Sequence, residues 1–305
     1  MKTRYPSALA LACLLLIAAP AKSADPAPAT HAPATHPPGA AVASVHALAT
    51  QAGIDMLGQG GNAFDAAVAV SAVLSVVEPI SSGLGGGGFF LLHDAKTGKD
   101  IFIDARETAP AAATPEAYLD ETGGFNRDRA TNGPWSAGIP GLPAGLVHMA
   151  SNYGRLPLKT SLAPAIRIAR EGFPVYERLV KGYASRRDVM ERYKGTRAVF
   201  LADGDTVEDG EVLLQPDLAR TLELLAEKGF DGFYRGPVAK KLLAGVKTEG
   251  GRWTAVELAG YRVREREPLR FEYDGWNVIT APPPSSGGVA LAQRMQMLEP
   301  WDLAK

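Results

Sequence analysis

The chain has 305 residues, of which 46% are hydrophobic and 21% charged, and 32 Lys and Arg against 33 Asp and Glu give a net charge of -1. This balance excludes the broad basic surface that nucleic-acid-binding proteins present. A chain of this length and composition can bury a sizeable core, in one large domain or two ordinary ones.

The first 23 residues have the layout of a secretory signal peptide. Lys2 and Arg4 precede an apolar run over residues 8–19, and a small-residue tripeptide follows it. The apolar run is too short to span a membrane. We therefore predict that residues 1–23 are removed and that the mature protein is periplasmic or secreted. Because Cys13 is the only cysteine, the mature chain would have neither a disulfide nor a thiol nucleophile.

Residues 24–41 are predicted to form a disordered Pro/Ala-rich linker. They contain a tandem Ala-Pro-Ala-Thr-His repeat and no large apolar side chain. Small residues and prolines cannot offset the entropy lost on ordering. We interpret His31 and His36 of this linker as incidental, not as metal ligands, and expect the folded region to be residues 42–305.

Two helices are predicted at the start of the folded region, over residues 46–57 and 62–77. Asn62 is a suitable N-cap and Asp65 lies in the first turn of the second helix. The second helix is apolar on nearly every face but has only about 16 residues, which indicates a helix buried in a layered fold, not a bilayer span. Further helices are predicted at 144–153, 162–171, 176–193, 216–228, 238–246, from 254 onward and at 289–298, and strands at 88–93, 100–105, 269–273 and 276–280.

A glycine-rich run at residues 83–88 formally contains the spacing of a dinucleotide-binding loop. That loop follows a strand and opens a helix, whereas here the glycines follow a helix and lead into a strand. We therefore reject a nucleotide site. Four consecutive glycines at 85–88 indicate a backbone that takes positive φ or passes close to a ligand or another chain segment.

Arg106 stands at the end of a predicted strand, beside the glycine run. It could form a structural ion pair with Asp104 or Glu107, or it could hold the carboxylate of a ligand through two parallel hydrogen bonds. The local pattern alone favours the ion pair. Ser285 and Ser286 are predicted to cap the following helix, because no histidine or carboxylate stands beside them to make a nucleophile.

No metal or cofactor site is predicted. His46, His93 and His148 are far apart in sequence and lack carboxylates at ligand spacing.

Several motifs occur in collinear order from about Val42 to the last residue, and together they resemble the γ-glutamyltranspeptidase family. They are Gln51-Ala52-Gly53, Gly60-Gly61-Asn62-Ala63-Phe64-Asp65-Ala66-Ala67-Val68-Ala69, Glu78-Pro79, the glycines at 85–88, Asp104-Ala105-Arg106-Glu107-Thr108-Ala109-Pro110, Gly138-Ile139-Pro140-Gly141, Phe233-Tyr234-Arg235-Gly236 and Pro282-Pro283-Pro284-Ser285-Ser286-Gly287-Gly288.

The resemblance implies an N-terminal-nucleophile hydrolase of the α/β (α+β) class, with a four-layer αββα sandwich. In that family a precursor cuts itself into a large and a small subunit. The threonine exposed at the new N-terminus, with its own α-amine as base, attacks the γ-glutamyl amide of glutathione or a related compound. The acyl group then passes to water, an amino acid or a dipeptide, and no cofactor takes part.

The sequence lacks parts that the precursors of this family contain. Family precursors are nearly twice as long, and no Thr-Thr pair followed by a strand is present here. We therefore expect residues 42–305 to be a large-subunit region truncated at its C-terminus, with the nucleophilic threonine beyond Lys305. We also expect this fragment alone to be inactive and its protein partner to be the small subunit of the same precursor.

Arg106 is the one position here that matches a family site residue, the arginine that binds the α-carboxylate of the γ-glutamyl group. In this context we predict that Arg106 binds substrate. Two other functions stay open. A dicarboxylic-acyl (glutaryl or cephalosporin) acylase of the same fold would also bind a carboxylate, and an inactive binding or scaffold protein would need no nucleophile.

Overall fold

The computed structural model describes residues 39–202 and 205–301. The predicted signal peptide, and the predicted linker up to residue 38, lie outside the described residues. The helices are α1 (Ala47–Gly58), α2 (Ala63–Val77), η1 (Pro115–Tyr118), α3 (Arg127–Thr131), α4 (Leu142–Asn152), α5 (Leu158–Glu171), α6 (Glu177–Met190), α7 (Lys194–Phe200), α8 (Pro216–Lys228), α9 (Phe230–Tyr234), α10 (Gly236–Thr248), α11 (Ala255–Gly260) and α12 (Ser286–Leu298). The strands are β1 (Gly88–Asp94), β2 (Lys99–Ala105), β3 (Phe173–Pro174), β4 (Leu201–Ala202), β5 (Asp205–Thr206), β6 (Val212–Leu213), β7 (Arg264–Arg266), β8 (Leu269–Tyr273) and β9 (Trp276–Thr280).

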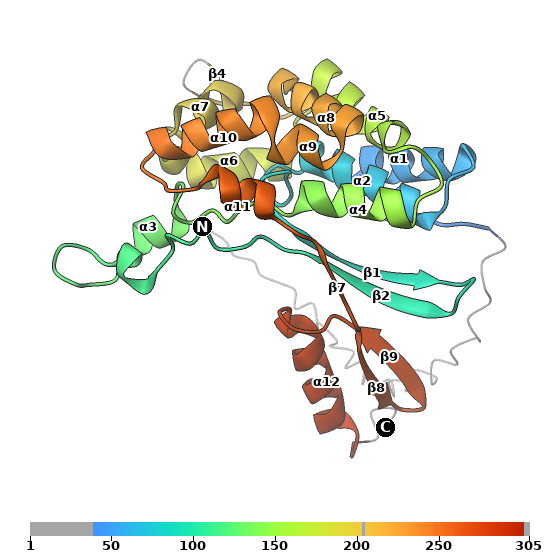
Figure 1. Cartoon of the computed structure of the whole chain (residues 1–305). Helices are drawn as coiled ribbons and strands as arrows, with labels where there is room; N and C mark the ends of the chain where they lie inside the picture. Colours follow the sequence, from blue (N-terminus) through green and yellow to red (C-terminus); the bar gives the residue numbers. More distant parts are fainter. Residues whose placement is uncertain (1–38, 203–204, 302–305) are drawn as a thin grey trace, which may run out of the picture. The chain divides into compact units, whose positions relative to one another are not determined.

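A three-stranded antiparallel sheet has the order β1-β2-β7, and its middle strand, β2, ends directly before Arg106 (Figure 1). The β1–β2 hairpin was predicted, and its register pairs Gly88 with Ala105. Strand β7 was not predicted, because its sequence Arg-Glu-Arg has no apolar residue. It pairs with β2 so that Arg264 lies opposite Asp104, and a short, charged strand is typical of the edge of a sheet.

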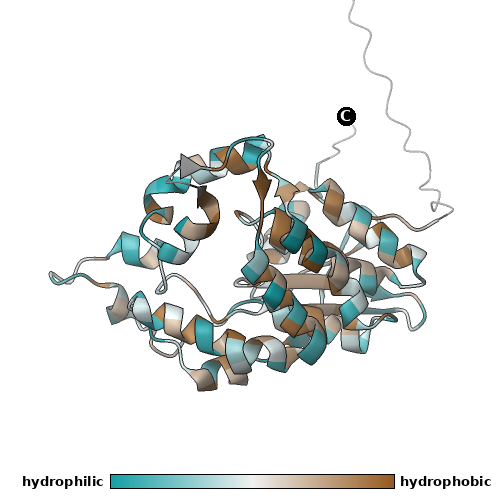
Figure 2. Ribbon diagram, turned by 90° about the horizontal axis from the view of Figure 1, so that it is seen from above, coloured by the Kyte–Doolittle hydropathy of each residue, from teal (hydrophilic) through white to brown (hydrophobic). Residues whose placement is uncertain are grey.

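Helices cover one face of this sheet (Figure 1). Helix α4 packs on β2, and α2 packs on α4 and α5, while α5 in turn packs on α8. The predicted burial of α2 is confirmed, because Val68, Ala69 and Val73 are each 0% exposed. Figure 2 shows hydrophilic and hydrophobic residues interspersed along the helices, as is typical of helices with one buried face.

The N-terminus of α2 is fixed by a buried carboxylate. Asn62 is the N-cap, as predicted, and together with Asp65 it forms a complete capping box, which was not predicted. Asp65 is 0% exposed, and it also accepts hydrogen bonds from the backbone N–H groups of Arg155 (3.0 Å) and Leu156 (3.1 Å). One side chain therefore joins the start of α2 to the turn between α4 and α5.

The second hairpin follows the predicted boundaries. The last helix, predicted over 289–298, begins earlier, at Ser286, so that Ser286 is its first residue and not a cap. Strands β8 and β9 are joined by Asp274 and Gly275, both with positive φ (47° and 75°), as a two-residue Asp-Gly turn requires. Ser285 caps α12 by accepting from the N–H of Gly287 at 3.3 Å. The prediction that Ser285 is a cap is thereby confirmed.

Some helix predictions differ from the structure. The helix predicted over 176–193 corresponds to α6, which ends earlier, at Met190. Tyr193 then takes an extended N-cap conformation and begins a further helix, α7, which was not predicted. Helix α5 begins at Leu158, directly after Pro157, and so earlier than predicted. The short elements η1, α3 and α9 were not predicted, because a few residues give no helical periodicity.

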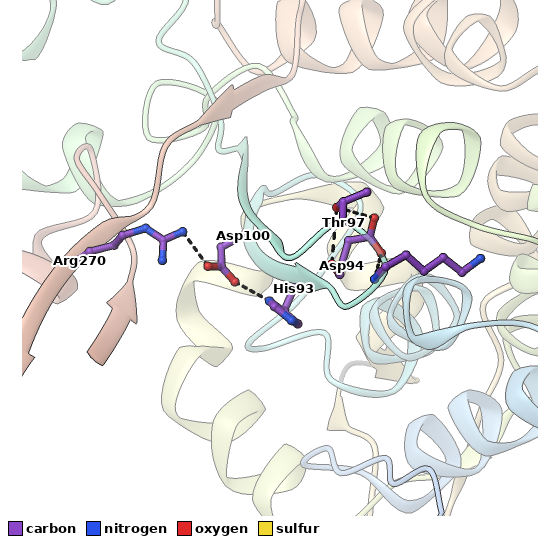
Figure 3. A network of polar contacts seen from close by, with 6 residues as sticks. His93, Asp94, Thr97, Asp100 and Arg270 are labelled. Carbon is purple, nitrogen blue, oxygen red and sulfur yellow. Dashed lines mark hydrogen bonds and ion pairs between the residues drawn. The ribbon is translucent and has the colours of Figure 1, made fainter. Parts of the chain in front are cut away.

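An ion-pair network links the tip of the β1–β2 hairpin to the open end of the β8–β9 hairpin (Figure 3). The carboxylate of Asp100 lies 2.7 Å from Nδ1 of His93 and accepts a hydrogen bond from Arg270 at 2.6 Å. In the adjacent turn, Thr97 donates to Asp94 at 2.9 Å. The pKa of Asp100 is lowered most by the hydrogen bond with His93 and next by the hydrogen bond from Arg270. The network therefore holds Asp100 ionised.

Asp65→Ala should destabilise the 305-residue chain by about 2–4 kcal/mol, because three partly buried backbone N–H groups, those of Asn62, Arg155 and Leu156, would lose their acceptor. Urea unfolding measures the free energy directly. The matched control is Asp55→Ala on α1, which is exposed and bonds only Gln51, and which should change stability by less than about 0.5 kcal/mol. Equal losses in the two variants would contradict the role given to Asp65.

His93→Ala should raise the pKa of Asp100 toward that of an ordinary aspartate, and Arg270→Gln should raise it by less. NMR titration of the side-chain carboxyl measures this, with Asp120 as the internal control, because its pKa is lowered by Thr122 and by backbone N–H groups and not by His93 or Arg270. Because the folded-state pKa is lowered, the network stabilises the fold above the unfolded pKa of about 3.9. This contribution is lost as the pH falls through the folded pKa. An Asp100 titration that neither variant moves would show that the network is not what holds the pKa down.

Candidate functional site

Arg106 directly follows the last residue of β2 and presents its side chain to solvent. The side chain is 60% exposed, and its Nε lies 3.4 Å from a carboxylate oxygen of Glu107. Its guanidinium carbon lies 5.7 Å from the ring centroid of Phe89, a distance typical of a cation–π contact. The sequence expectation of an ion pair is met by Glu107. Asp104 instead accepts a hydrogen bond from Nε of Arg266 at 2.9 Å.

The backbone of Arg106, in contrast, is fixed on both sides. Its N–H donates to Asp104 at 3.0 Å, and its C=O accepts from the hydroxyl of Tyr261 at 2.8 Å. Tyr261 is only 4% exposed. Burial, and then the negative charges of Asp104 and Glu107, raise the pKa of Tyr261 far above its ordinary value. The hydroxyl therefore stays protonated and remains a donor to Arg106.

The glycine run packs against this same backbone. A Cβ at Gly87 would lie 2.6–2.8 Å from backbone atoms of Ala105, Glu107 and Arg106. None of the glycines at 85–88 has positive φ. Of the two explanations that the sequence offered, close approach to another chain segment is therefore confirmed for Gly87, and positive φ is wrong.

The segment that follows Arg106 is held by the loop before α4. Thr108 and Ile139 exchange two backbone hydrogen bonds, of 3.2 and 2.8 Å. A Cβ at Gly138 would lie 2.8 Å from Cβ of Glu107, and one at Gly141 would collide with the carbonyl of Ala105. The backbone of this segment is therefore closely packed on both sides.

Two cavities meet at Arg106. One, of about 490 Å³, is lined by four arginines and two carboxylates together with three other residues: Arg106, Arg262, Arg264, Arg266, Asp104, Glu107, Thr108, Tyr261 and Pro284. The other, of about 390 Å³, is lined by Arg106 together with Gly85, Tyr118, Trp135 and Gly138. An exposed guanidinium on a fixed backbone between two cavities is suited to bind a carboxylate.

The histidines named from the sequence have structural partners. His46 caps α1 by accepting from Leu48, and burial lowers its pKa. His93 pairs with Asp100, and His148 pairs with Glu265. Within the described ranges no cluster of His, Cys, Asp or Glu could hold a metal ion. Nor is any helix there both long and apolar enough to cross a membrane.

The family model described as γ-glutamyltranspeptidase matches residues 49–305 of this chain. The chain belongs to this family. It is 40% identical over 267 residues to a glutathione hydrolase proenzyme of Bacillus subtilis (strain 168), a match that covers 87% of this chain and 45% of that protein. The chain thus spans less than half of this curated relative.

Solved structures agree with this assignment. The γ-glutamyltranspeptidase of Helicobacter pylori superposes with a TM-score of 0.85 at 36% identity, covering 89% of this chain and 78% of the other. A cephalosporin acylase from Bacillus halodurans gives a TM-score of 0.74 at 35% identity, with coverage of 86% and 51%. The expected fold, part of a γ-glutamyltranspeptidase-type N-terminal-nucleophile hydrolase, is therefore confirmed.

Gly87→Ala should destabilise the chain by about 1–3 kcal/mol, because the added methyl group meets backbone that cannot turn away. Urea unfolding gives the value. The matched control is Gly83→Ala, whose Cβ would meet nothing within 4 Å and which should stay within about 0.5 kcal/mol of the parent. If both variants unfold at the same urea concentration as the parent, the close packing at Gly87 does not hold the Arg106 segment.

Proposed function

We propose that this chain is the large-subunit part of an exported γ-glutamyl transferase and hydrolase that acts on glutathione and related γ-glutamyl amides. The observation that carries the proposal is Arg106, a half-exposed guanidinium on a fixed backbone at the junction of two cavities. Family membership and the name of the Bacillus subtilis relative support the choice of substrate. The layout of residues 1–23 supports export to the periplasm or beyond.

In this proposal Arg106 binds the α-carboxylate of the γ-glutamyl group. A planar guanidinium can donate two parallel hydrogen bonds to a carboxylate, which fixes the orientation of the ligand as well as its position. Glu107 lies 3.4 Å from Nε, so the terminal nitrogens of Arg106 are free to face the ligand. The Phe89 ring beneath the guanidinium limits its movement.

The bond-breaking residue is proposed to lie on a small subunit released from the same precursor. The match covers only 45% of the Bacillus subtilis relative, which leaves room for such a subunit. The hydroxyl of its N-terminal threonine would attack the γ-carbonyl carbon and give up its proton to the α-amine. The amide C–N bond would break, and the leaving amine would depart with that proton. Water or an amino acid would then take the acyl group.

A dicarboxylic-acyl acylase is the second candidate, and one observation favours keeping it. A cephalosporin acylase is among the similar solved structures, and a glutaryl group ends in a carboxylate that Arg106 could bind equally well. The two candidates differ in the α-ammonium group, which only a γ-glutamyl substrate carries. Comparing turnover of γ-glutamyl and glutaryl amides of the same amine separates them.

Arg106→Lys, in the precursor that continues past Lys305, should raise KM for γ-glutamyl donors at least about tenfold, because lysine offers a point charge without the paired donors. Steady-state hydrolysis of a γ-glutamyl anilide measures this. Arg167→Lys, at an exposed ion pair on α5, is the matched control and should leave KM unchanged. The 305-residue chain alone should give no turnover. An unchanged KM in Arg106→Lys would remove Arg106 from the site.

A further inference from the structure

The register of the sheet places more than one arginine on the face that carries Arg106. Side chains alternate between the two faces of a strand, so Asp104 and Arg106 share one face of the sheet. Because Arg264 lies directly opposite Asp104, Arg264 and Arg266 project from that same face. On the opposite face Glu265 pairs with His148 of α4, which confirms the alternation.

These arginines differ in how their charges are balanced. Arg266 is paired with Asp104 at 2.9 Å, and Arg106 approaches Glu107 at 3.4 Å. Arg262 donates to the backbone carbonyls of Ala259 (3.0 Å) and Tyr261 (2.7 Å), and its guanidinium carbon lies 5.9 Å from the ring centroid of Phe230. In the part of the chain that the structure describes, Arg264 has no carboxylate within ion-pair distance.

We propose that Arg264 forms a second carboxylate subsite in the cavity of about 490 Å³ that it shares with Arg106. The subsite would bind the carboxylate of the leaving or accepting peptide. This deepens the proposed function and rests on it. The favoured substrates are therefore γ-glutamyl compounds with a second carboxylate on the amine side, such as glutathione, over uncharged γ-glutamyl amides.

The distances available suit such a substrate. Arg106 directly follows β2, and continuing the register of β2 and β7 places it diagonally from Arg264, at roughly 7–8 Å. The two carboxylates of glutathione are separated by the γ-glutamyl side chain and the dipeptide together, and so lie at most about 11 Å apart when extended. Because each arginine side chain reaches several more ångströms from the backbone, roughly 5 Å or more, one guanidinium can bind the α-carboxylate of the γ-glutamyl group while the other binds the peptide carboxylate. An accepting dipeptide enters where the leaving group departs, so its carboxylate would also bind Arg264.

The test is Arg264→Gln in the precursor that continues past Lys305, assayed with two donors. Glutathione carries the second carboxylate, and a γ-glutamyl anilide lacks it. The variant should raise KM for glutathione roughly fivefold or more and leave KM for the anilide within twofold. Arg264→Lys should restore most of the glutathione KM, because it keeps the charge. The matched control, Arg167→Gln, removes an exposed arginine on α5 and should change neither KM.

A second arm separates the leaving peptide from the accepting one. With the anilide as donor, glycylglycine and its C-terminal amide are compared as acceptors, and Arg264→Gln should reduce the advantage of the free carboxylate. The parent's preference should also weaken as salt is raised, since exposed charges are screened over about 8 Å at physiological ionic strength. The subsite is overturned if Arg264→Gln changes both donors equally or changes neither. Absence of turnover with either donor in the parent would instead overturn the proposed function.

Discussion

The site depends on one short stretch of backbone, residues 105–108, which has almost no freedom to move. Tyr261 donates a buried hydrogen bond to the carbonyl of Arg106, and Gly87 and Gly141 bring two other segments into direct contact with the same backbone. A rigid backbone under an exposed side chain is what a ligand-binding residue needs, because little conformational entropy then remains to be lost on binding. The rigidity comes from positions that carry no chemistry of their own.

The two faces of the β1-β2-β7 sheet have different roles: one packs against a helix and stabilises the fold, and the other carries the residues of the proposed binding site. One face packs on α4, where Gly145 admits the methyl group of Ala105 and Glu265 pairs with His148. The other face carries Asp104, Arg106, Arg264 and Arg266. Because strand side chains alternate, a single register fixes both assignments, and a shift of one residue would exchange them. The unpredicted strand β7 therefore contributes as much to the proposed site as the predicted β2.

Local patterns predicted the parts of the fold that depend on neighbouring residues. Asn62 is the N-cap of α2, and Asp274-Gly275 marks the β8–β9 turn. Strand β7 escaped prediction because its partner lies about 160 residues away in the chain and its composition is charged. For Arg106 the local pattern favoured an ion pair, and only the resemblance to a family suggested substrate binding. The cavities, the Tyr261 hydrogen bond and the position of Arg264 depend on tertiary contacts that no local spacing encodes.

We propose above that the guanidinium of Arg106 holds the α-carboxylate of a γ-glutamyl group. A crystal structure of the processed enzyme, grown from the complete precursor and soaked with glutamate, would test this contact itself. We expect the α-carboxylate within hydrogen-bond distance of two nitrogens of Arg106, with the side-chain carboxyl directed toward the new N-terminal threonine. Glutamate bound elsewhere, with Arg106 still turned to Glu107, would contradict it.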